Sequence, residues 1–245
     1  MTNGSAASDW IATHRGRWAR KASVRAVYGA YFRRLRNACA SPGPIVEIGC
    51  GPAFFKECHP EVIAIDVIRN PHADVIADAA ALPYGDGALG NIVLLDVFHH
   101  LPAPAQFLRE VARTLRPGGR LVMIEPWTGV AGRWLYTYLH HETCDATVDP
   151  AAPWSHDTKD PMEGNVALPS LYFAAGGHLP RLGLPLRVTE RDPFAALPWL
   201  LSGGFQPPTL LPARWHSVAA AADRLLSRVP AWTATRCFIA VEKTS

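Results

Sequence analysis

The stretch VEIGCGPA at residues 46–53 decides the fold of this chain. Apolar residues run directly into a glycine turn, which predicts a buried strand that ends there and a helix that follows. Glycines let the backbone turn tightly and approach a ligand closely, and the N-terminus of the next helix offers unpaired N–H groups. The stretch therefore predicts a ligand-binding turn between a strand and a helix.

Short apolar runs alternate with helical patterns from Ile45 to Glu125, which indicates parallel strands joined by crossover helices. Between the last two runs, residues 104–115 have the spacing of an amphipathic helix, and Arg116–Gly119 is expected to end it. Beyond Glu125 the pattern weakens. The expected strands lie at 44–48, 61–66, 73–76, 91–95, 120–124, 186–190 and 235–242, with further helices at 9–40 and 215–226.

Asp66 ends the second expected strand, 19 residues after Glu47, where a carboxylate can accept both hydroxyls of a ribose bound over the first strand. A dinucleotide site and an S-adenosylmethionine site both fit this position. A dinucleotide turn normally has a third glycine, which is absent from GCGPAF at residues 49–54. Glu47 would repel a pyrophosphate and suits the ammonium and sulfonium charges of S-adenosylmethionine, so charge favours the methyl donor.

Four motifs over about residues 44–126 resemble the class I S-adenosylmethionine-dependent methyltransferases of the small-molecule type, with a methyltransferase type 11-like domain. The motifs are VEIGCGPA with Asp66, DAAALPY at 78–84, LLDVFHHL at 94–101 and LREVARTLRPGGRLVMIEP at 108–126. The resemblance implies a Rossmann-like α/β fold. Its seven-stranded, mostly parallel sheet has an antiparallel last strand and helices on both faces.

The resemblance also implies that S-adenosyl-L-methionine is the cofactor. The cofactor-binding residues that it implies are Glu47, Gly49, Gly51, Asp66, Asp78, Ala79 and Asp96. Glu47 and the two glycines would hold the amino-acid end, and Asp66 the ribose diol. Asp78 would accept from the adenine amine and Ala79 would donate a backbone N–H to the ring, while the Asp96 carbonyl would face the methionine part. A turn-capping role for Asp78 stays open.

One domain is expected, because 245 residues with 49% apolar composition suffice for one sizeable core. The basic residues of the N-terminal helices form a solvated face or attract an anionic substrate. The expected parts are an N-terminal helical cap (1–43), a cofactor-binding core (44–126), substrate-side insertions (127–183 and 195–214) and the C-terminal part of the sheet (184–194 and 215–245). The insertion after the fifth strand and the N-terminal helices are expected to close over the cleft.

A catalytic base is needed only for some acceptors, since methyl transfer is an in-line displacement that depends largely on positioning. His141, His140 and Glu142 follow the fifth strand and are the candidate catalytic residues, with His141 preferred. Helical neighbours point about 100 degrees apart, so these side chains are not expected to share a metal ion. Capping or packing in a lid is the alternative role. The pair His99-His100 is expected to pack or to line the cofactor pocket.

The acceptor is expected to be a small molecule, in keeping with a secondary-metabolite substrate. Tyr138, Arg133 and Trp127 are the candidate acceptor-binding residues, because aromatic residues crowd this region and an arginine suits an anionic group on the acceptor. The motifs specify neither the atom that is methylated nor the oligomeric state.

Composition and charge bear on which other classes of function this chain could have. A formal net charge of +3 requires no nucleic-acid partner, and the five cysteines suit neither a disulfide framework nor a zinc cluster. The chain has no signal-peptide pattern and no long apolar run, so a cytoplasmic protein without a membrane partner is expected. The main alternative is a protein of the same fold that binds S-adenosylmethionine without transferring methyl. A nicotinamide dehydrogenase and an RNA methyltransferase are further alternatives.

Overall fold

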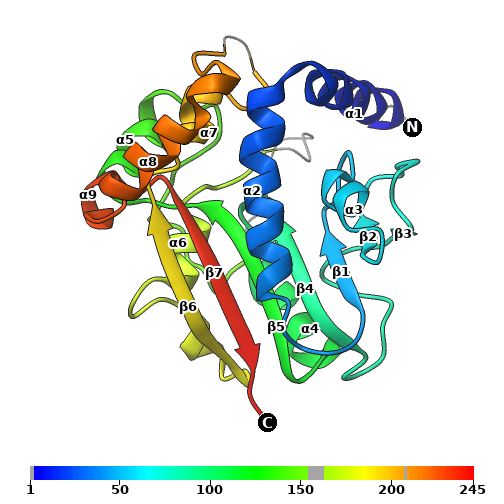
Figure 1. Ribbon diagram of the computed structural model, residues 1–245. Helices are drawn as coiled ribbons and strands as arrows, with labels where there is room; N and C mark the ends of the chain where they lie inside the picture. Colours follow the sequence, from blue (N-terminus) through cyan, green and yellow to red (C-terminus); the bar gives the residue numbers. More distant parts are fainter. Residues whose placement is uncertain (1–2, 154–162, 207–208) are drawn as a thin grey trace.

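A computed structural model describes residues 3–153, 163–206 and 209–245 (Figure 1). The strands are β1 (Ile45–Ile48), β2 (Ile63–Asp66), β3 (Val75–Ile76), β4 (Leu89–Leu95), β5 (Leu115–Pro126), β6 (Leu186–Phe194) and β7 (Arg236–Lys243). The α-helices are α1 (Asn3–Arg20), α2 (Ala22–Ala38), α3 (Phe54–Cys58), α4 (Pro104–Thr114), α5 (Val130–Tyr138), α6 (Leu168–Phe173), α7 (Leu197–Ser202), α8 (His216–Leu226) and α9 (Pro230–Thr233). Short 3₁₀ helices are η1 (Phe98–His100), η2 (Leu179–Leu182) and η3 (Ala213–Trp215).

Seven strands form one sheet in the order β3-β2-β1-β4-β5-β7-β6. Strands β1 to β5 pair in parallel, and β7 runs antiparallel to both of its neighbours. Figure 1 shows β7 and β6 along one side of the sheet and α2 crossing one of its faces. The arrangement confirms the expected Rossmann-like fold, including the antiparallel last strand.

Apolar side chains of both faces of the sheet are buried, which explains the nearly continuous apolar runs of its central strands. Along β5, Leu121 and Met123 belong to one core cluster, whereas Val122 and Ile124 belong to the other. The first cluster is closed by α4 residues Phe107, Leu108 and Val111. The second is closed by α2 residues Val27, Tyr31, Phe32 and Leu35.

Several expected strand boundaries differ from those of the structure by two to five residues, and the largest difference is at β5. The strand β5 begins at Leu115 rather than at residue 120, because Leu115 already pairs with Leu89 of β4 and the glycine turn lies within the paired segment. The helix α5 ends at Tyr138, so His140, His141 and Glu142 lie beyond it. The limits expected for the cap and the insertions stay predictions, and residues 154–162 of the first insertion lie outside the described part of the chain.

Gly49 occupies a backbone conformation that favours glycine. Its φ is +66°, and an added Cβ would lie 2.7 Å from Val97 Cγ2. The left-handed conformation costs a residue with a side chain about 1–2 kcal/mol. We therefore expect Gly49→Ala to lower the free energy of unfolding in urea by about that amount.

Gly85→Ala is the matched control for this substitution. An added Cβ at Gly85 meets no atom within 4 Å, and Gly85 has no positive φ. Its stability should stay within about 0.5 kcal/mol of the parent or rise slightly. Equal urea midpoints for the two variants would refute the strain at Gly49.

Candidate cofactor site

The turn after β1 contains three residues in the left-handed conformation. Gly49, Gly51 and Ala53 have φ values of +66°, +48° and +57°. Cys50 donates its backbone N–H to Ile65 O of β2 at 2.9 Å, which ties the turn to the next strand. Ala53 thus has a conformation that glycine would adopt without strain.

Glu47 is a buried carboxyl group without a hydrogen-bond partner at one oxygen. It lies in β1 with 7% of its surface exposed, and its Oε2 accepts no hydrogen bond from the described residues. Burial, and then the negative charge of Asp66, raise the pKa of Glu47 to about 8. The carboxyl is therefore mostly protonated at pH 7, and a cation placed beside it would favour release of that proton.

Asp66 is fixed at the end of β2 by backbone donors. Its Oδ2 accepts the Gly51 N–H at 2.8 Å, and its Oδ1 accepts the Ile68 N–H at 3.0 Å. Asn70 donates its side-chain amide to the Gly51 carbonyl. The structure thus brings the Asp66 carboxylate to the glycine turn, beside the strand that carries Glu47.

Asp78 and Ala79 lie in the loop after β3. Asp78 is exposed, and its Oδ1 accepts the Ala80 N–H at 2.8 Å, as in a side-chain-capped turn. Ala79 is buried. Asp78 therefore caps this turn with one carboxylate oxygen. Its other oxygen could still accept a hydrogen bond from the adenine amine.

Asp96 follows β4 with a φ of +57°, and its carboxylate is paired with a buried arginine. Arg236 Nη2 donates to Asp96 Oδ2 at 2.8 Å, and Nη1 lies 2.8 Å from Oδ1. The guanidinium carbon lies 4.2 Å from the ring centroid of Trp199. Sequence reasoning missed Arg236, although an arginine inside the apolar run at 235–242 was a signal that could have identified it.

The helix α1 lies against the glycine turn. The ring of Trp10 would contact a Cβ added at Gly51, at 3.4 Å. Arg15 Nη1 donates to Pro52 O at 2.8 Å, and its Nη2 lies 3.1 Å from Glu57 Oε2. A ligand at this turn would therefore contact the N-terminal helix as well as the sheet.

His99 connects two carboxylates beside the ends of β4 and β5. Its Nδ1 lies 2.7 Å from Glu125 Oε2, and its Nε2 lies 3.2 Å from Glu142 Oε2. Glu125 Oε1 accepts the backbone N–H groups of Val97 and Phe98, each at 2.8 Å. Burial alone would lower the pKa of His99, but the two carboxylates outweigh it and raise the pKa to about 10. The imidazole is therefore charged at pH 7, which makes Glu125–His99–Glu142 a buried ion-pair chain.

His99, His100 and Glu142 offer potential metal-ligand atoms within 4.8 Å of one another. Both ring nitrogens of His99, however, already face carboxylate oxygens. A protonated imidazole has no lone pair for a metal ion. We therefore describe this group as part of the ion-pair chain, and the absence of a metal stays an expectation from the sequence.

The three candidate catalytic residues lie beyond the end of α5. The side chain of His141 is 79% exposed, whereas that of Glu142 is only 10% exposed and lies against His99. His140 is half-buried, its Nδ1 accepts the Glu142 N–H at 3.3 Å, and burial lowers its pKa. The chain leaves the helical path at this point, and its Glu142 side chain pairs with His99. Of the three, Glu142 reaches the ends of β4 and β5.

The three candidate acceptor-binding residues have different environments. Trp127 is buried and donates its backbone N–H to Thr235 O at 2.9 Å. Arg133 and Tyr138 are exposed on α5. Their expected contacts with an acceptor stay predictions.

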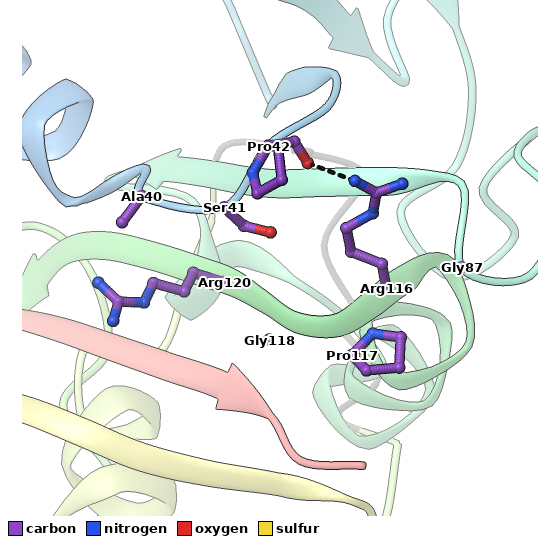
Figure 2. A pocket seen from close by; sticks show the side chains of 8 residues that line it. All are labelled: Ala40, Ser41, Pro42, Gly87, Arg116, Pro117, Gly118 and Arg120. Atoms are coloured by element: carbon purple, nitrogen blue, oxygen red, sulfur yellow. Dashed lines mark hydrogen bonds between the residues drawn. The ribbon is translucent and has the colours of Figure 1, made fainter.

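A pocket of about 640 Å³ lies away from all of these residues (Figure 2). Its lining comes from the segments before β1 and β4 and from the first residues of β5, at the opposite ends of the strands from the glycine turn. Arg116 donates to Pro42 O at 3.0 Å, and Arg120 pairs with Glu242 at 3.2 Å. Ligands of open parallel sheets bind beyond the carboxyl ends of the strands, so this pocket is not the cofactor site.

Comparisons with known proteins agree with this geometry. Residues 46–123 match the family model described as a methyltransferase domain. Methyltransferase GfsG of Streptomyces halstedii is 44% identical over 50 residues, which cover 20% of this chain and 18% of that protein. A Mycolicibacterium smegmatis protein named as a probable S-adenosylmethionine-dependent methyltransferase is 30% identical over 109 residues, covering 39% of this chain and 42% of that protein. The chain thus spans less than half the length of these relatives.

Solved structures with little sequence identity share the fold. Geranyl diphosphate C-methyltransferase of Streptomyces coelicolor gives a TM-score of 0.53 at 16% identity, covering 89% of this chain and 79% of that one. The [4+2]-cyclase SpnF gives 0.52 at 13% identity, covering 87% and 81%. At this identity the likeness shows the fold alone.

The sheet order, the glycine turn and the carboxylate at the end of β2 define the class I methyltransferase fold. With the family match, residues 46–123 are identified as a class I S-adenosylmethionine-dependent methyltransferase domain.

Proposed function

We propose that this protein binds S-adenosyl-L-methionine at the turn after β1 and catalyses methyl transfer to a small-molecule acceptor. The observation that supports this most directly is the arrangement of two carboxyl groups at the turn. Asp66 is held by Gly51 N–H at the end of β2, and Glu47 lies buried in β1 with an oxygen that lacks a partner among the described residues. One carboxylate suits a ribose diol, and the other suits an ammonium group.

The residues at the turn fit the positive end of this cofactor better than a pyrophosphate. A buried carboxyl without a partner is costly, and a cationic hydrogen-bond donor would satisfy Glu47. The same carboxyl would repel an anionic phosphate. Glu47, Gly49, Gly51 and Asp66 are therefore the residues that would hold the cofactor, together with Asp78, Ala79 and Asp96 from the neighbouring loops.

When bound, S-adenosyl-L-methionine supplies an electrophilic methyl group for an in-line displacement. The residues of this chain then act by positioning and by excluding water. Asp66 and the turn would hold the cofactor at the ends of β1 and β2. Trp10 and Arg15 of α1 cover the turn from the other side.

A base is required for a hydroxyl acceptor, and Glu142 has the best-placed side chain among the three candidates. It lies 10% exposed beside His99, while His141 faces solvent. The pKa of Glu142 is held at about 2 by His99 and neighbouring histidines despite burial, which makes it a weak base. We therefore assign Glu142 a positioning role, in which it holds His99 beside the ends of β4 and β5. Proton removal by His140 or His141 stays a prediction.

Binding of the cofactor should be coupled to ionisation of Glu47. Below a pKa of about 8 the buried carboxyl is mostly protonated, and an ammonium group favours its charged form. Binding then releases a proton, so affinity should rise with pH up to about 8. For a Glu47 pKa of about 8, and because the α-amino group of the free cofactor itself loses its proton near pH 8, the expected gain in affinity between pH 7 and pH 8 is about two- to threefold.

Glu47→Gln is the control for this pH dependence. Glutamine keeps the shape of the side chain and does not titrate, so the gain in affinity with rising pH should disappear. Titrations in buffers of different ionisation enthalpy would measure the released proton directly. The same pH dependence in both proteins would show that another group is responsible.

The acceptor would lie where aromatic side chains of α2 and α7 approach the Asp96–Arg236 pair. Trp199 stacks on Arg236, and Tyr28 contacts Phe205 with ring centroids 5.2 Å apart. Aromatic rings beside a charged pair would suit a small organic acceptor. The proposal includes an acceptor that carries an anionic group. It also includes a cytoplasmic location for the protein.

Incubation with methyl-labelled S-adenosylmethionine and a metabolite extract tests the proposed activity. A labelled product that is heavier than an extract component by one methyl group would support it. Cofactor binding without any product would favour the alternative, in which the fold binds S-adenosylmethionine without transferring methyl.

A further inference from the structure

Exposed large apolar side chains gather on α5, α8, α9 and the segments next to them, which lie together at one corner of the molecule (Figure 1). We call this surface the α5–α9 face. Its apolar residues are Val130, Trp134, Tyr138, Leu139, Leu210, Trp215, Val218, Leu225, Leu226, Val229 and Trp232. Many exposed apolar side chains on neighbouring elements mark a candidate interaction site.

The helix α5 contributes a regular stripe to this face. Val130, Trp134 and Tyr138 follow at intervals of four residues, and the rings of Trp134 and Tyr138 have centroids 6.3 Å apart. Gly132 and Tyr136 occupy the opposite, buried side of the helix. One side of α5 thus packs on the protein while the other presents aromatic rings to solvent.

Close backbone packing holds α5 against α9. A Cβ at Gly132 would lie 2.9 Å from Ala234 O, and one at Gly129 would lie 3.0 Å from the same oxygen. Tyr136 donates its hydroxyl to Thr235 O at 2.7 Å. The α5–α9 face is therefore built on fixed helices, next to the start of β7 that carries Arg236.

The charges on the α5–α9 face are positive. Arg133, Arg214, Arg224 and Arg228 are exposed, and none has an ion pair with the residues that the structure describes. The acid of α8, Asp223, accepts the Leu197 N–H at 2.7 Å and is half-buried. A two-fold contact between copies of this face would bring arginines towards arginines, whereas an anionic surface would complement them.

We propose that the α5–α9 face binds the surface of an anionic lipid bilayer. Aromatic and aliphatic side chains would enter the interfacial layer, and the four arginines would contact lipid phosphates. This interaction is additional to the proposed methyl transfer, and it replaces the expectation of no membrane partner. No helix among the described residues is long and apolar enough to cross a membrane, and binding of this kind requires none.

Co-sedimentation with lipid vesicles tests this inference without cofactor or acceptor. We expect the protein to sediment with phosphatidylglycerol-rich vesicles, to remain in solution with phosphatidylcholine vesicles, and to be released by salt. The double variant Arg224→Gln/Arg228→Gln should bind the phosphatidylglycerol-rich vesicles about 25-fold more weakly, because each arginine contributes about fivefold to the affinity. Trp134→Glu/Trp232→Glu should remove binding.

Arg109→Gln on α4 is the matched control, since it removes one exposed arginine far from the α5–α9 face (Figure 1). It should bind vesicles as the parent does, and thermal unfolding should show that all variants are folded. Equal binding to both lipids, or loss of binding in Arg109→Gln, would overturn the proposal. An absence of vesicle binding would also overturn it. If sedimentation velocity then showed a dimer that Trp134→Glu/Trp232→Glu dissociates, the α5–α9 face would be a contact between copies of this chain.

Discussion

His99→Leu should destabilise the protein by about 3–5 kcal/mol, measured as the free energy of unfolding in urea. His99 is 3% exposed and lies between two carboxylates, at 2.7 Å from Glu125 and 3.2 Å from Glu142. Removing the shared cation leaves the buried Glu125 and the 10% exposed Glu142 without their partner, and breaking a buried pair in this way costs about that amount.

The pH dependence of the free energy of unfolding should also reflect the Glu125–His99–Glu142 ion-pair chain. The pKa of His99 is raised to about 10 from 6.5, so its contribution is complete below pH 6.5 and is lost as pH rises through about 10. The pKa of Glu142 is lowered to about 2 from 4.5, so its contribution is present above pH 4.5 and is lost as pH falls towards 2. These two groups therefore stabilise the fold most between about pH 4.5 and 6.5.

His141→Leu is the control for His99→Leu, because the side chain of His141 is exposed. It should change stability by less than about 0.5 kcal/mol. If His99→Leu does not fold, Glu142→Gln provides the test, since it should remove the loss of stability between pH 4.5 and 2. Equal stability of His99→Leu and the parent would contradict the ion-pair chain.

Asp66→Ala should weaken binding of S-adenosylmethionine by about 2–3 kcal/mol, or roughly 30- to 150-fold in Kd. The substitution removes the charge-assisted hydrogen bonds proposed to the ribose hydroxyls. It also frees the Gly51 N–H that Asp66 Oδ2 accepts at 2.8 Å, so the turn loses its fixed position.

Asp86→Ala removes an exposed carboxylate that pairs with Arg113 at 3.0 Å, away from the turn. This control should bind the cofactor as the parent does. An unchanged Kd for Asp66→Ala would mean that the ribose does not lie at the end of β2. A similar loss in both variants would indicate a general effect of charge.

The sequence predicts the central part of this protein well because local signals and fold agree there. The run at 46–53 specifies a strand and a left-handed turn, the helix α3 begins at the next residue, Phe54, and Asp66 follows at the end of the next strand. Strands that are buried on both faces leave the continuous apolar runs that identified the sheet.

The substrate side is less predictable because its contacts join distant segments. Nothing near Glu142 in the sequence indicates that its side chain pairs with His99, which lies 43 residues earlier. Arg236 and Asp96 are separated by most of the chain. The α5–α9 face is likewise assembled from segments about a hundred residues apart, none of which is unusual alone.

Calorimetric titration of the protein with S-adenosylmethionine, its demethylated product and NAD tests the central claim most directly. The account predicts one saturable site for the methyl donor and its product, with no heat of binding for NAD. Binding of NAD in place of S-adenosylmethionine would contradict the role assigned to Glu47. A protein that binds neither methyl donor nor product would contradict the proposed function altogether.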